Sequence, residues 1–184
     1  MDLIHVSNTD FNVEIDLKYA TNDNFIGSAV YNKAAKCYLH PEAAQCLKNA
    51  VALASPLGFK LLIYDAYRPS EAQWKLWEHT PDPNFLADPA KGSPHSRGVA
   101  IDLTLLDRKG VVLNMGTAFD AFTPLSHHGR TDIPLEAQKN RLLLMGIMTT
   151  AGWDFYRNEW WHYQLFNSKN YPVLSDKDTG TGMM

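Results

Sequence analysis

Apolar residues recur with helical spacing in three segments of the chain. In the segment 41–58, alanine and leucine return every three or four residues, with a proline first and a glycine last. A proline at the start and a glycine at the end are typical of a helix. The same spacing predicts helices over 69–79 and 134–152. We interpret the apolar stripes of these two later helices as core positions, namely Trp74, Trp77, Leu142, Met145 and Met148.

Apolar runs bounded by turn residues predict the strands. They cover 59–67, 98–107 and 159–166, and alternating apolar positions add a fourth strand over 12–20. Residues 107–110, of sequence DRKG, are typical of a hairpin turn into the next apolar run. Because strands and helices do not alternate regularly, we expect an α+β fold with a mostly antiparallel central sheet packed with helices.

Length and composition indicate a single domain over 1–184. A chain of 184 residues, 45% of them hydrophobic, can bury a core without disulfides. Cys37 and Cys46 fit neither a zinc knuckle nor a disulfide scaffold, and we interpret them as partly buried thiols in a reducing compartment. The polar, glycine-rich residues 176–184 are expected to be flexible.

Charge and hydropathy argue against two classes of partner, nucleic acids and membranes. With a net charge of −3, the chain lacks the basic stripe that nucleic-acid binding requires. We interpret the basic cluster at 139–141 as an exposed helix face. The sequence contains no run of eighteen apolar residues and no secretory leader, so we expect no membrane association and a cytoplasmic location. These patterns do not determine the oligomeric state.

Asp102 stands in an otherwise apolar strand. The odd positions 99–105 are all apolar, so Asp102 shares the opposite face with Ala100 and Thr104. Taken alone, a lone aspartate there is most simply exposed to solvent. His95 changes this interpretation, because its turn-rich surroundings can bring an imidazole back to the start of the strand. Such a pair is a plausible half of a zinc site.

The segment NEWWHYQL supplies the other half. If His162 is a third protein ligand, the metal has two histidines and one aspartate, and one position stays open for water. Glu159 would then be a free carboxylate able to take a proton from that water. In a regular strand, residues 159 and 162 point to opposite faces, so a bend is required. The alternative is an exposed glutamate and a core histidine.

Arg68 and two further histidines have competing interpretations. Arg68 follows a buried strand and precedes Pro69, where a guanidinium could stabilise an oxyanion. The simpler alternative is an ion pair with Asp65 or Glu71. The adjacent His127 and His128 lie in a polar segment and are expected to be solvated.

Taken together, the stretches SPHSRGVAID, EWWH and YDAYRP resemble the M15 family of zinc peptidases, in particular its D-alanyl-D-alanine dipeptidase branch. DLKYATNDNF, MGTAFD and NRLLLMGIMT are similar to that branch as well, so the resemblance covers roughly residues 10–175. It implies a fold shared with the murein D,D-peptidases and the hedgehog signalling domain.

The resemblance also implies roles for individual residues. Glu159 corresponds to the general base and Arg68 to a group that stabilises the transition state. Pro94 departs from the pattern, because a small polar residue is expected before the first ligand histidine. The implied ligands of one Zn²⁺ per chain are His95, Asp102 and His162. The implied substrate-binding residues are Asp120, which receives the ammonium group, and Tyr19 and Ser93, which line the cavity.

The activity implied by the resemblance is the zinc-dependent hydrolysis of the free dipeptide D-alanyl-D-alanine to two molecules of D-alanine. Two alternatives stay open: a D,D-carboxypeptidase or murein endopeptidase of the same superfamily, and a non-catalytic zinc-containing binding module. Asp120 favours the dipeptidase over the carboxypeptidase, since a buried acid pairs with a free amine and not with an acylated one. Glu159 distinguishes an enzyme from a binding module.

Overall fold

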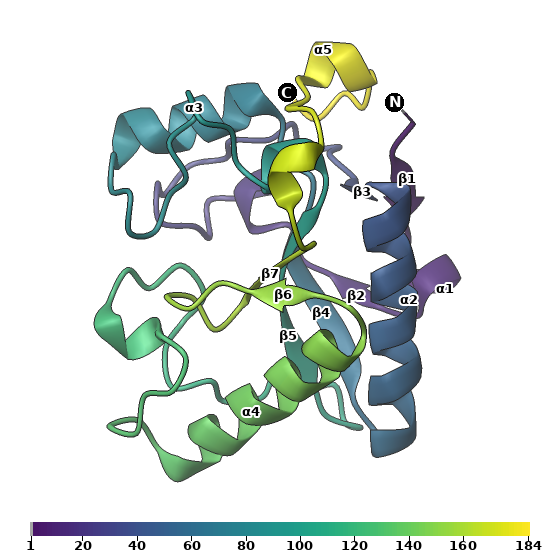
Figure 1. Ribbon diagram of the computed structural model, residues 1–184, viewed down its shortest axis with the longest axis vertical. Coiled ribbons are helices and arrows are strands. Elements are labelled where there is room, and N and C mark those ends of the chain that lie inside the picture. The colour runs from purple at the N-terminus through teal and green to yellow at the C-terminus, as the bar shows by residue number, and fades with distance from the viewer. Residues whose placement is uncertain (1) are drawn as a thin grey trace.

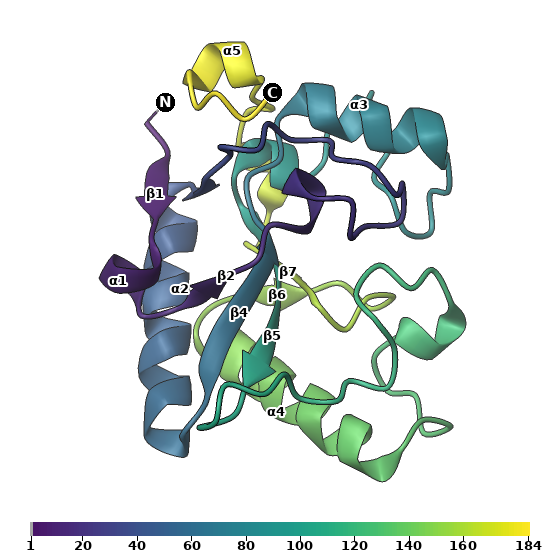
Figure 2. The ribbon, with the colours of Figure 1, turned by 180° about the vertical axis from the view of Figure 1, so that it is seen from behind.

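A five-stranded sheet forms the centre of the molecule (Figures 1 and 2). The computed structural model describes residues 2–184. Only β2 and β4 pair in parallel, and every other neighbouring pair is antiparallel. The predicted α+β class with a mostly antiparallel sheet is therefore confirmed. In sheet order, the strands are β2 (Glu14–Ile15), β4 (Lys60–Asp65), β5 (Ala100–Leu106), β7 (His162–Gln164) and β6 (Asp154–Phe155).

Helices surround this sheet, and a small antiparallel pair, β1 (Ile4–Val6) with β3 (Cys37–Leu39), lies beside it. The two long helices α2 and α4 contact each other and pack on strands, whereas α3 lies at the other end of the molecule (Figure 1). The α-helices are α1 (Asn8–Phe11), α2 (Pro41–Ala54), α3 (Ser70–His79), α4 (Leu135–Thr150) and α5 (Asp176–Thr179). The 3-10 helices are η1 (Lys18–Ala20), η2 (Ser55–Leu57), η3 (His95–Arg97), η4 (Pro124–Ser126) and η5 (Ser168–Asn170).

The predicted helices and hairpin are confirmed, with shifts at their ends. α2 begins at Pro41, and the segment ends through η2 at Gly58, whose φ of 83° lies in the left-handed region that favours glycine. The chain reverses direction in the turn at 107–110, and Leu106 at the end of β5 then pairs with Val112 in a short antiparallel bridge.

Two predicted strands are shorter than expected. Residues 12–20 form only β2, because after Asp16 N–H donates to Ile63 O the chain turns into η1. Residues 159–166 form only β7. The chain before it folds into a turn in which Glu159 N–H donates to Tyr156 O at 3.3 Å. This turn is the bend that the sequence required before Glu159 could share a face with His162.

The predicted apolar stripes of α3 and α4 were partly wrong. Trp74 is 47% exposed and Leu142 is 61% exposed, and Met145 is only half-buried. α3 instead buries a face on which Ala72, Gln73 and Leu76 lie. On α4 the core positions are Ala137, Arg141, Leu144, Ile147 and Met148. The basic residue Arg141, expected on an exposed face, is therefore among the buried ones.

The C-terminal segment packs against the rest of the chain, contrary to the flexibility expected of residues 176–184. Met183 is fully buried, and its carbonyl accepts a hydrogen bond of 2.6 Å from Asn32 N–H. The Asp176 carboxylate accepts bonds from the backbone N–H groups of Met183 and Met184. None of the helices in residues 2–184 is long and apolar enough to cross a membrane.

The strand register brings the polar residues of the central sheet together. A β-bulge between Ile63 and Asp65 sets Asp65 opposite Asp102, and Asp102 in turn pairs with His162. Asp102 is 2% exposed, and Ala100 and Thr104 on the same face are fully buried. The solvent-facing interpretation of Asp102 is therefore wrong, because other parts of the chain cover both faces of β5.

His128 is half-buried, contrary to the solvated position expected for it. Its ring packs against Phe155 and Tyr163, with centroid distances of 5.0 and 6.3 Å. Burial, and secondarily the charge of Arg141, lower the pKa of His128 to about 4. The folded state therefore favours the neutral ring, and this contribution to stability is present above the unfolded pKa and lost as the pH falls from about 6.5 towards 4.

We predict that His128→Gln makes the metal-free protein less sensitive to acid. Between pH 8 and pH 5 the wild type should lose about 2 kcal/mol of unfolding free energy through this residue alone. Urea unfolding at both pH values measures the loss, and His79→Gln, at an exposed position on α3, is the matched control. An equal acid sensitivity in all three proteins would contradict the assignment.

Candidate active site

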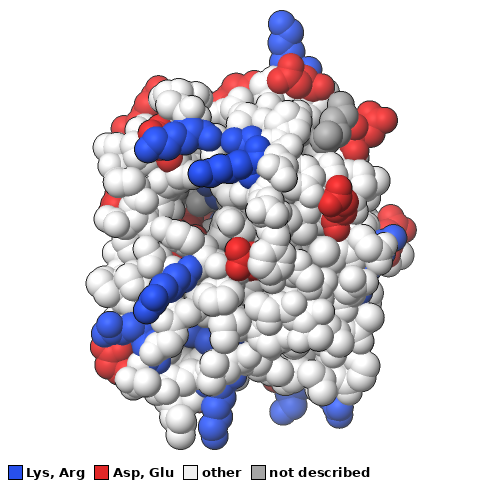
Figure 3. All heavy atoms as spheres, viewed as in Figure 1, with Lys and Arg blue, Asp and Glu red and all other residues white. Residues whose placement is uncertain are grey.

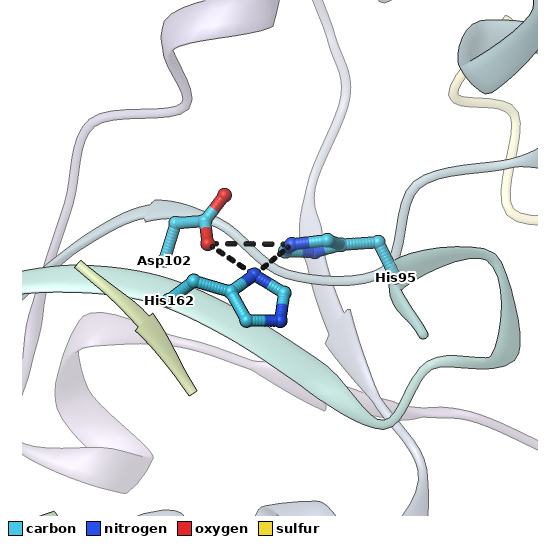
Figure 4. A group of neighbouring side chains, drawn as sticks. All are labelled: His95, Asp102 and His162. Carbon is cyan, nitrogen blue, oxygen red and sulfur yellow. Dashed lines mark hydrogen bonds and ion pairs between the residues drawn. The ribbon is translucent and has the colours of Figure 1, made fainter. Parts of the chain in front are cut away.

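Three side chains, two from the central sheet and one from η3, point toward one another (Figure 4). Asp102 projects from β5, His162 begins β7, and His95 begins η3, which follows Ser93 and Pro94. All three are buried, with exposed fractions of 2, 7 and 3% respectively. Their ligand atoms form the one cluster of potential metal ligands found within residues 2–184.

The distances between the three ligand atoms suit a tetrahedral metal. His95 Nε2 lies 3.1 Å from His162 Nδ1 and 3.3 Å from Asp102 Oδ1, and His162 Nδ1 lies 3.0 Å from Asp102 Oδ1. A tetrahedral ion with metal–ligand bonds of ~2.0–2.1 Å has ligands about 3.3 Å apart. The side chains therefore already stand at spacings close to those such an ion requires.

The outer hydrogen bonds of the two histidines fix which nitrogen faces the cluster. His95 Nδ1 lies 2.7 Å from the carbonyl oxygen of Ala66, which can only accept, so Nδ1 carries a proton and donates. His162 Nε2 lies 3.1 Å from Gln164 Oε1 and donates in the same way. In the neutral rings, Nε2 of His95 and Nδ1 of His162 are then lone-pair donors. They converge on the Asp102 carboxylate, and a cation is the partner that this arrangement accommodates.

The electrostatics of Asp102 agree with this geometry. Burial by itself raises the pKa of a carboxyl group, but positive charge on His95 and His162 lowers the pKa of Asp102 by more, and the net value lies well below the usual range. A cation bound between the three side chains, with the rings neutral, would act on Asp102 in the same direction. Asp102 is therefore ionised in the folded protein and can serve as an anionic ligand.

Arg68 lies beside the cluster in an ion pair, as the simpler interpretation expected. Its Nε donates to Asp65 Oδ2 at 2.9 Å, and its Nη1 donates to Gln73 Oε1 at the same distance. Nη2 lies 2.8 Å from Asp65 and 3.6 Å from Asp102. Burial opposes the charge, but Asp65, Tyr19 and Tyr31 raise the pKa of Arg68 well above its usual value. The guanidinium also lines the cavity described below, so the ion pair and a role in the site are compatible.

Glu159 lies next to the cluster but outside it. Its Oε2 is 3.8 Å from His162 Nδ1, and the side chain is buried. Burial, followed by the negative charges of Asp102 and Asp120, raises the pKa of Glu159 well above its usual value, against the opposing effect of Arg68. A carboxylate whose pKa is raised in this way is a stronger base than a solvated one.

The remaining predicted residues form the walls of one cavity. Asp120 has a φ of 56°, uncommon for a residue other than glycine, and its Oδ2 accepts a 2.7 Å hydrogen bond from the Tyr19 hydroxyl. Burial, and then Asp102, raise the pKa of Asp120 to about 8. Ser93 is buried, and its Oγ accepts from the N–H of His95 at 3.2 Å.

This cavity brings together all eight residues proposed from the sequence. Its volume is about 290 Å³, and Figure 3 shows its mouth as a hollow with basic side chains beside it. Two basic residues, Arg97 and Lys169, are among those that line the cavity. The eight predicted residues in the lining are Tyr19, Arg68, Ser93, His95, Asp102, Asp120, Glu159 and His162. His127 and His128 are not part of it.

Several residues around the cavity were missed by sequence reasoning. Trp161 and Tyr156 line it, and Gln164 holds His162. Tyr31 donates to Asp65 Oδ1 at 2.7 Å, which completes the partners of that carboxylate. Gln164 stands two residues after His162, so its place on the same face of a strand was a usable signal. Tyr31 lies far away in the sequence and gave none.

Comparisons with known proteins agree over most of the chain. Residues 1–177 match the Peptidase_M15 family model, described as D-ala-D-ala dipeptidase. A D-alanyl-D-alanine dipeptidase of Escherichia coli strain K12 is 47% identical over 165 residues, covering 90% of this chain and 85% of that protein. A second, from Enterococcus faecium, is 37% identical over 184 residues, covering 87% of this chain and 89% of the relative.

A third D-alanyl-D-alanine dipeptidase, from Streptomyces coelicolor, is 37% identical and covers 82% of this chain and 84% of its own. Among solved structures, the LdcB LD-carboxypeptidase aligns with a TM-score of 0.47 at 18% identity, covering 98% of this chain and 91% of that one. On the match of its sequence from residue 1 to residue 177, the chain belongs to the Peptidase_M15 family of D-Ala-D-Ala dipeptidases.

Proposed function

We propose that this protein hydrolyses the free dipeptide D-alanyl-D-alanine to two molecules of D-alanine, with one Zn²⁺ per chain. The observation that carries the proposal is the cavity that a three-ligand cluster, a separate buried carboxylate and an arginine line together. Its relatives from Escherichia coli and Enterococcus faecium bear the name of this activity and are matched over most of their length.

His95, Asp102 and His162 would hold the metal, since their ligand atoms have the spacing and the protonation that a tetrahedral ion needs. Two imidazoles and one carboxylate leave a position free, as in catalytic zinc sites. When bound there, zinc supplies a Lewis acid that polarises the scissile carbonyl and acidifies water.

Glu159 is assigned the proton transfers. It accepts a proton from the water that attacks the peptide carbonyl, and it donates a proton to the amine of the departing D-alanine as the C–N bond breaks. Its carboxylate is buried beside the cluster without being one of the three ligands, and its raised pKa favours accepting the proton.

Arg68 is assigned to the negative charge that develops on the carbonyl oxygen. Its guanidinium is held from two sides by Asp65 and Gln73, and it remains charged because its pKa is raised. A donor fixed in advance stabilises a developing oxyanion without reorganising during the reaction.

Asp120, Tyr19 and Ser93 are assigned to the two ends of the dipeptide. Asp120 would pair with the free ammonium group, and the Tyr19 hydroxyl, which donates to Asp120, keeps its carboxylate in place. The Ser93 hydroxyl accepts a hydrogen bond from His95 N–H, so its own proton can be donated in a hydrogen bond to the other end of the substrate. A volume of about 290 Å³ lies at the lower end of small-molecule sites and suits a dipeptide.

The two alternatives fit the site less well. A D,D-carboxypeptidase or murein endopeptidase would bring an acylated chain to Asp120 and leave this carboxyl group without a cationic partner. A binding module with structural zinc would have no use for Glu159 and Arg68 beside the ligands. A cytoplasmic location stays a prediction from the sequence. A dipeptidase of this kind would serve either D-alanine recycling or glycopeptide resistance.

The proposed reaction is tested by the release of D-alanine from three substrates. The zinc-loaded protein should release it rapidly from D-Ala-D-Ala and slowly or not at all from N-acetyl-D-Ala-D-Ala and L-Ala-L-Ala. Removal of the metal with a chelator should abolish the release, and zinc should restore it. Preference for the acetylated substrate would indicate a carboxypeptidase, and inactivity on all three with zinc bound would indicate a binding module.

We predict that Glu159→Gln retains about one zinc per chain but lowers kcat by roughly 10²–10⁴-fold, the range for loss of a general acid–base. His162→Ala should lose the metal as well. Elemental analysis of the dialysed proteins and initial rates distinguish the two effects. Glu136→Gln, at an exposed position in the first turn of α4, is the matched control. A near-normal rate in Glu159→Gln would exclude it as the general base.

We predict that Asp120→Asn weakens the recognition of the free amine. The value of kcat/KM for D-Ala-D-Ala should fall by about 10²-fold, because the ammonium group then lies in the cavity without an anionic partner. Inhibition by N-propionyl-D-alanine, which is the substrate without its amino group, should change little. The control is Asp132→Asn, at an exposed aspartate that pairs with Arg130. Equal losses for both ligands would contradict the assignment.

A further inference from the structure

Arg141 is a buried cation that lies outside the cavity. It projects from α4, is 4% exposed and forms no ion pair with any of residues 2–184. Its Nε donates to Met115 O at 2.6 Å, and its Nη1 donates to Leu125 O at 2.8 Å and to His127 O at 3.1 Å. Burying a charge is costly unless its donors are satisfied. Here three backbone carbonyls supply most of that compensation, and the rigid fork of a guanidinium fixes their positions.

The three carbonyls belong to the two ends of one segment, residues 115–127. In Figure 1 this is the loop with the short helix η4 that lies beside α4. Asp120 is in the middle of the segment, and the cavity lies on its inner side. Arg141 therefore joins both ends of the segment that carries Asp120.

Two hydroxyl groups continue this connection inside the segment. Ser126 Oγ donates its one proton to Ala121 O at 2.6 Å. The 3.0 Å hydrogen bond between Ser126 and Thr117 must then be donated by Thr117 Oγ1. The lone pairs of Thr117 are left to accept from Arg141 Nη2 at 3.4 Å and from Trp160 Nε1 at 2.9 Å.

The result is a directed chain of hydrogen bonds that ends beside Asp120. It runs from Arg141 and Trp160 through Thr117 and Ser126 to the carbonyl of Ala121, the residue after Asp120. Trp160 also donates its backbone N–H to Ser126 O at 3.0 Å.

Trp160 is the neighbour of Glu159 in the sequence. Through Trp160, the same chain of hydrogen bonds therefore joins the two loops that carry Glu159 and Asp120, the carboxylates of the proposed site.

The backbone of Asp120 needs such support. Its φ of 56° is a left-handed conformation, which a residue other than glycine keeps only where its surroundings enforce it. The Asp120 carboxylate is held by a single hydroxyl, that of Tyr19. A small shift of the loop would carry the carboxylate away from the place where the amine of a dipeptide binds.

We propose that Arg141, Thr117 and Ser126 are positioning residues that hold Asp120 at the amine end of the site and thereby set the preference for a free amino group. This inference rests on the proposed function for the identity of the ligand. None of the three residues lines the cavity, so they act through the loop and not on the substrate.

The test uses Thr117→Val, which keeps the shape of the side chain and removes the hydroxyl. The zinc-loaded variant should show a KM for D-Ala-D-Ala raised about tenfold, with kcat within about twofold, as expected for a displaced binding group. Inhibition by N-propionyl-D-alanine, which has no amine to recognise, should stay within about twofold of wild type.

Thr123→Val is the matched control. It makes the same substitution in the same loop, at a hydroxyl that only accepts a long bond of 3.4 Å from Leu125 N–H, and both constants should stay unchanged. An unchanged KM in Thr117→Val, or an equal rise of the KM and the inhibition constant, would overturn the proposal.

Ser126→Ala interrupts the chain one step later and gives an independent check. Hydrogen exchange of residues 115–127 should be faster in Thr117→Val and Ser126→Ala than in wild type and Thr123→Val. Unchanged exchange in both variants would overturn the proposal. If wild type hydrolyses none of the three substrates, the proposed function is wrong. Hydrogen exchange then still decides whether the chain holds the loop.

Discussion

The structure depends on a concentration of buried acidic groups where β4, β5 and β7 meet. Asp65, Asp102 and Glu159 are all buried there, and Arg68 is the one guanidinium or ammonium group that pairs with them among residues 2–184. Burying carboxylates is unfavourable unless positive charge and hydrogen bonds accompany them. Part of that compensation comes from Arg68, and the two histidines beside Asp102 supply more, directly or through the metal ion that we propose they hold. The fold and the proposed metal site are therefore linked by one electrostatic requirement.

Two groups of residues in the cavity are positioned in different ways. The three proposed metal ligands form its floor, and the other predicted residues form its walls. The proposed metal ligands come from paired strands and from η3, and the outer hydrogen bonds of the two histidines go to Ala66 O and to Gln164. The groups assigned to proton transfer and amine recognition come from irregular segments, which strand pairing does not position. Glu159 precedes β7 in a turn, and Asp120 lies in a loop. Side-chain hydrogen bonds take the place of strand pairing there.

This difference explains a buried arginine, Arg141, that has no carboxylate partner among residues 2–184. Arg141 and the hydroxyls of Thr117 and Ser126 supply a loop with the rigidity that a strand obtains from its neighbours. The arrangement also connects the loop of Asp120 to the turn of Glu159 through Trp160. The two carboxylates can then keep a constant separation, which a reaction on a small substrate of fixed length requires.

The sequence by itself predicted the three longer helices, the central strands β4 and β5, and eight residues that line one cavity. The spacing of apolar residues and the positions of turn residues predict helices, strands and turns. The order of the motifs in the chain matched that of a known family. The tertiary structure decided what depends on contacts between distant segments. It buried both faces of β5 around Asp102, turned Glu159 towards His162, and packed Arg141 and Met183 inside, where the composition of their segments indicated exposed positions. Burial is set by whatever covers a residue, and local sequence carries no record of that partner.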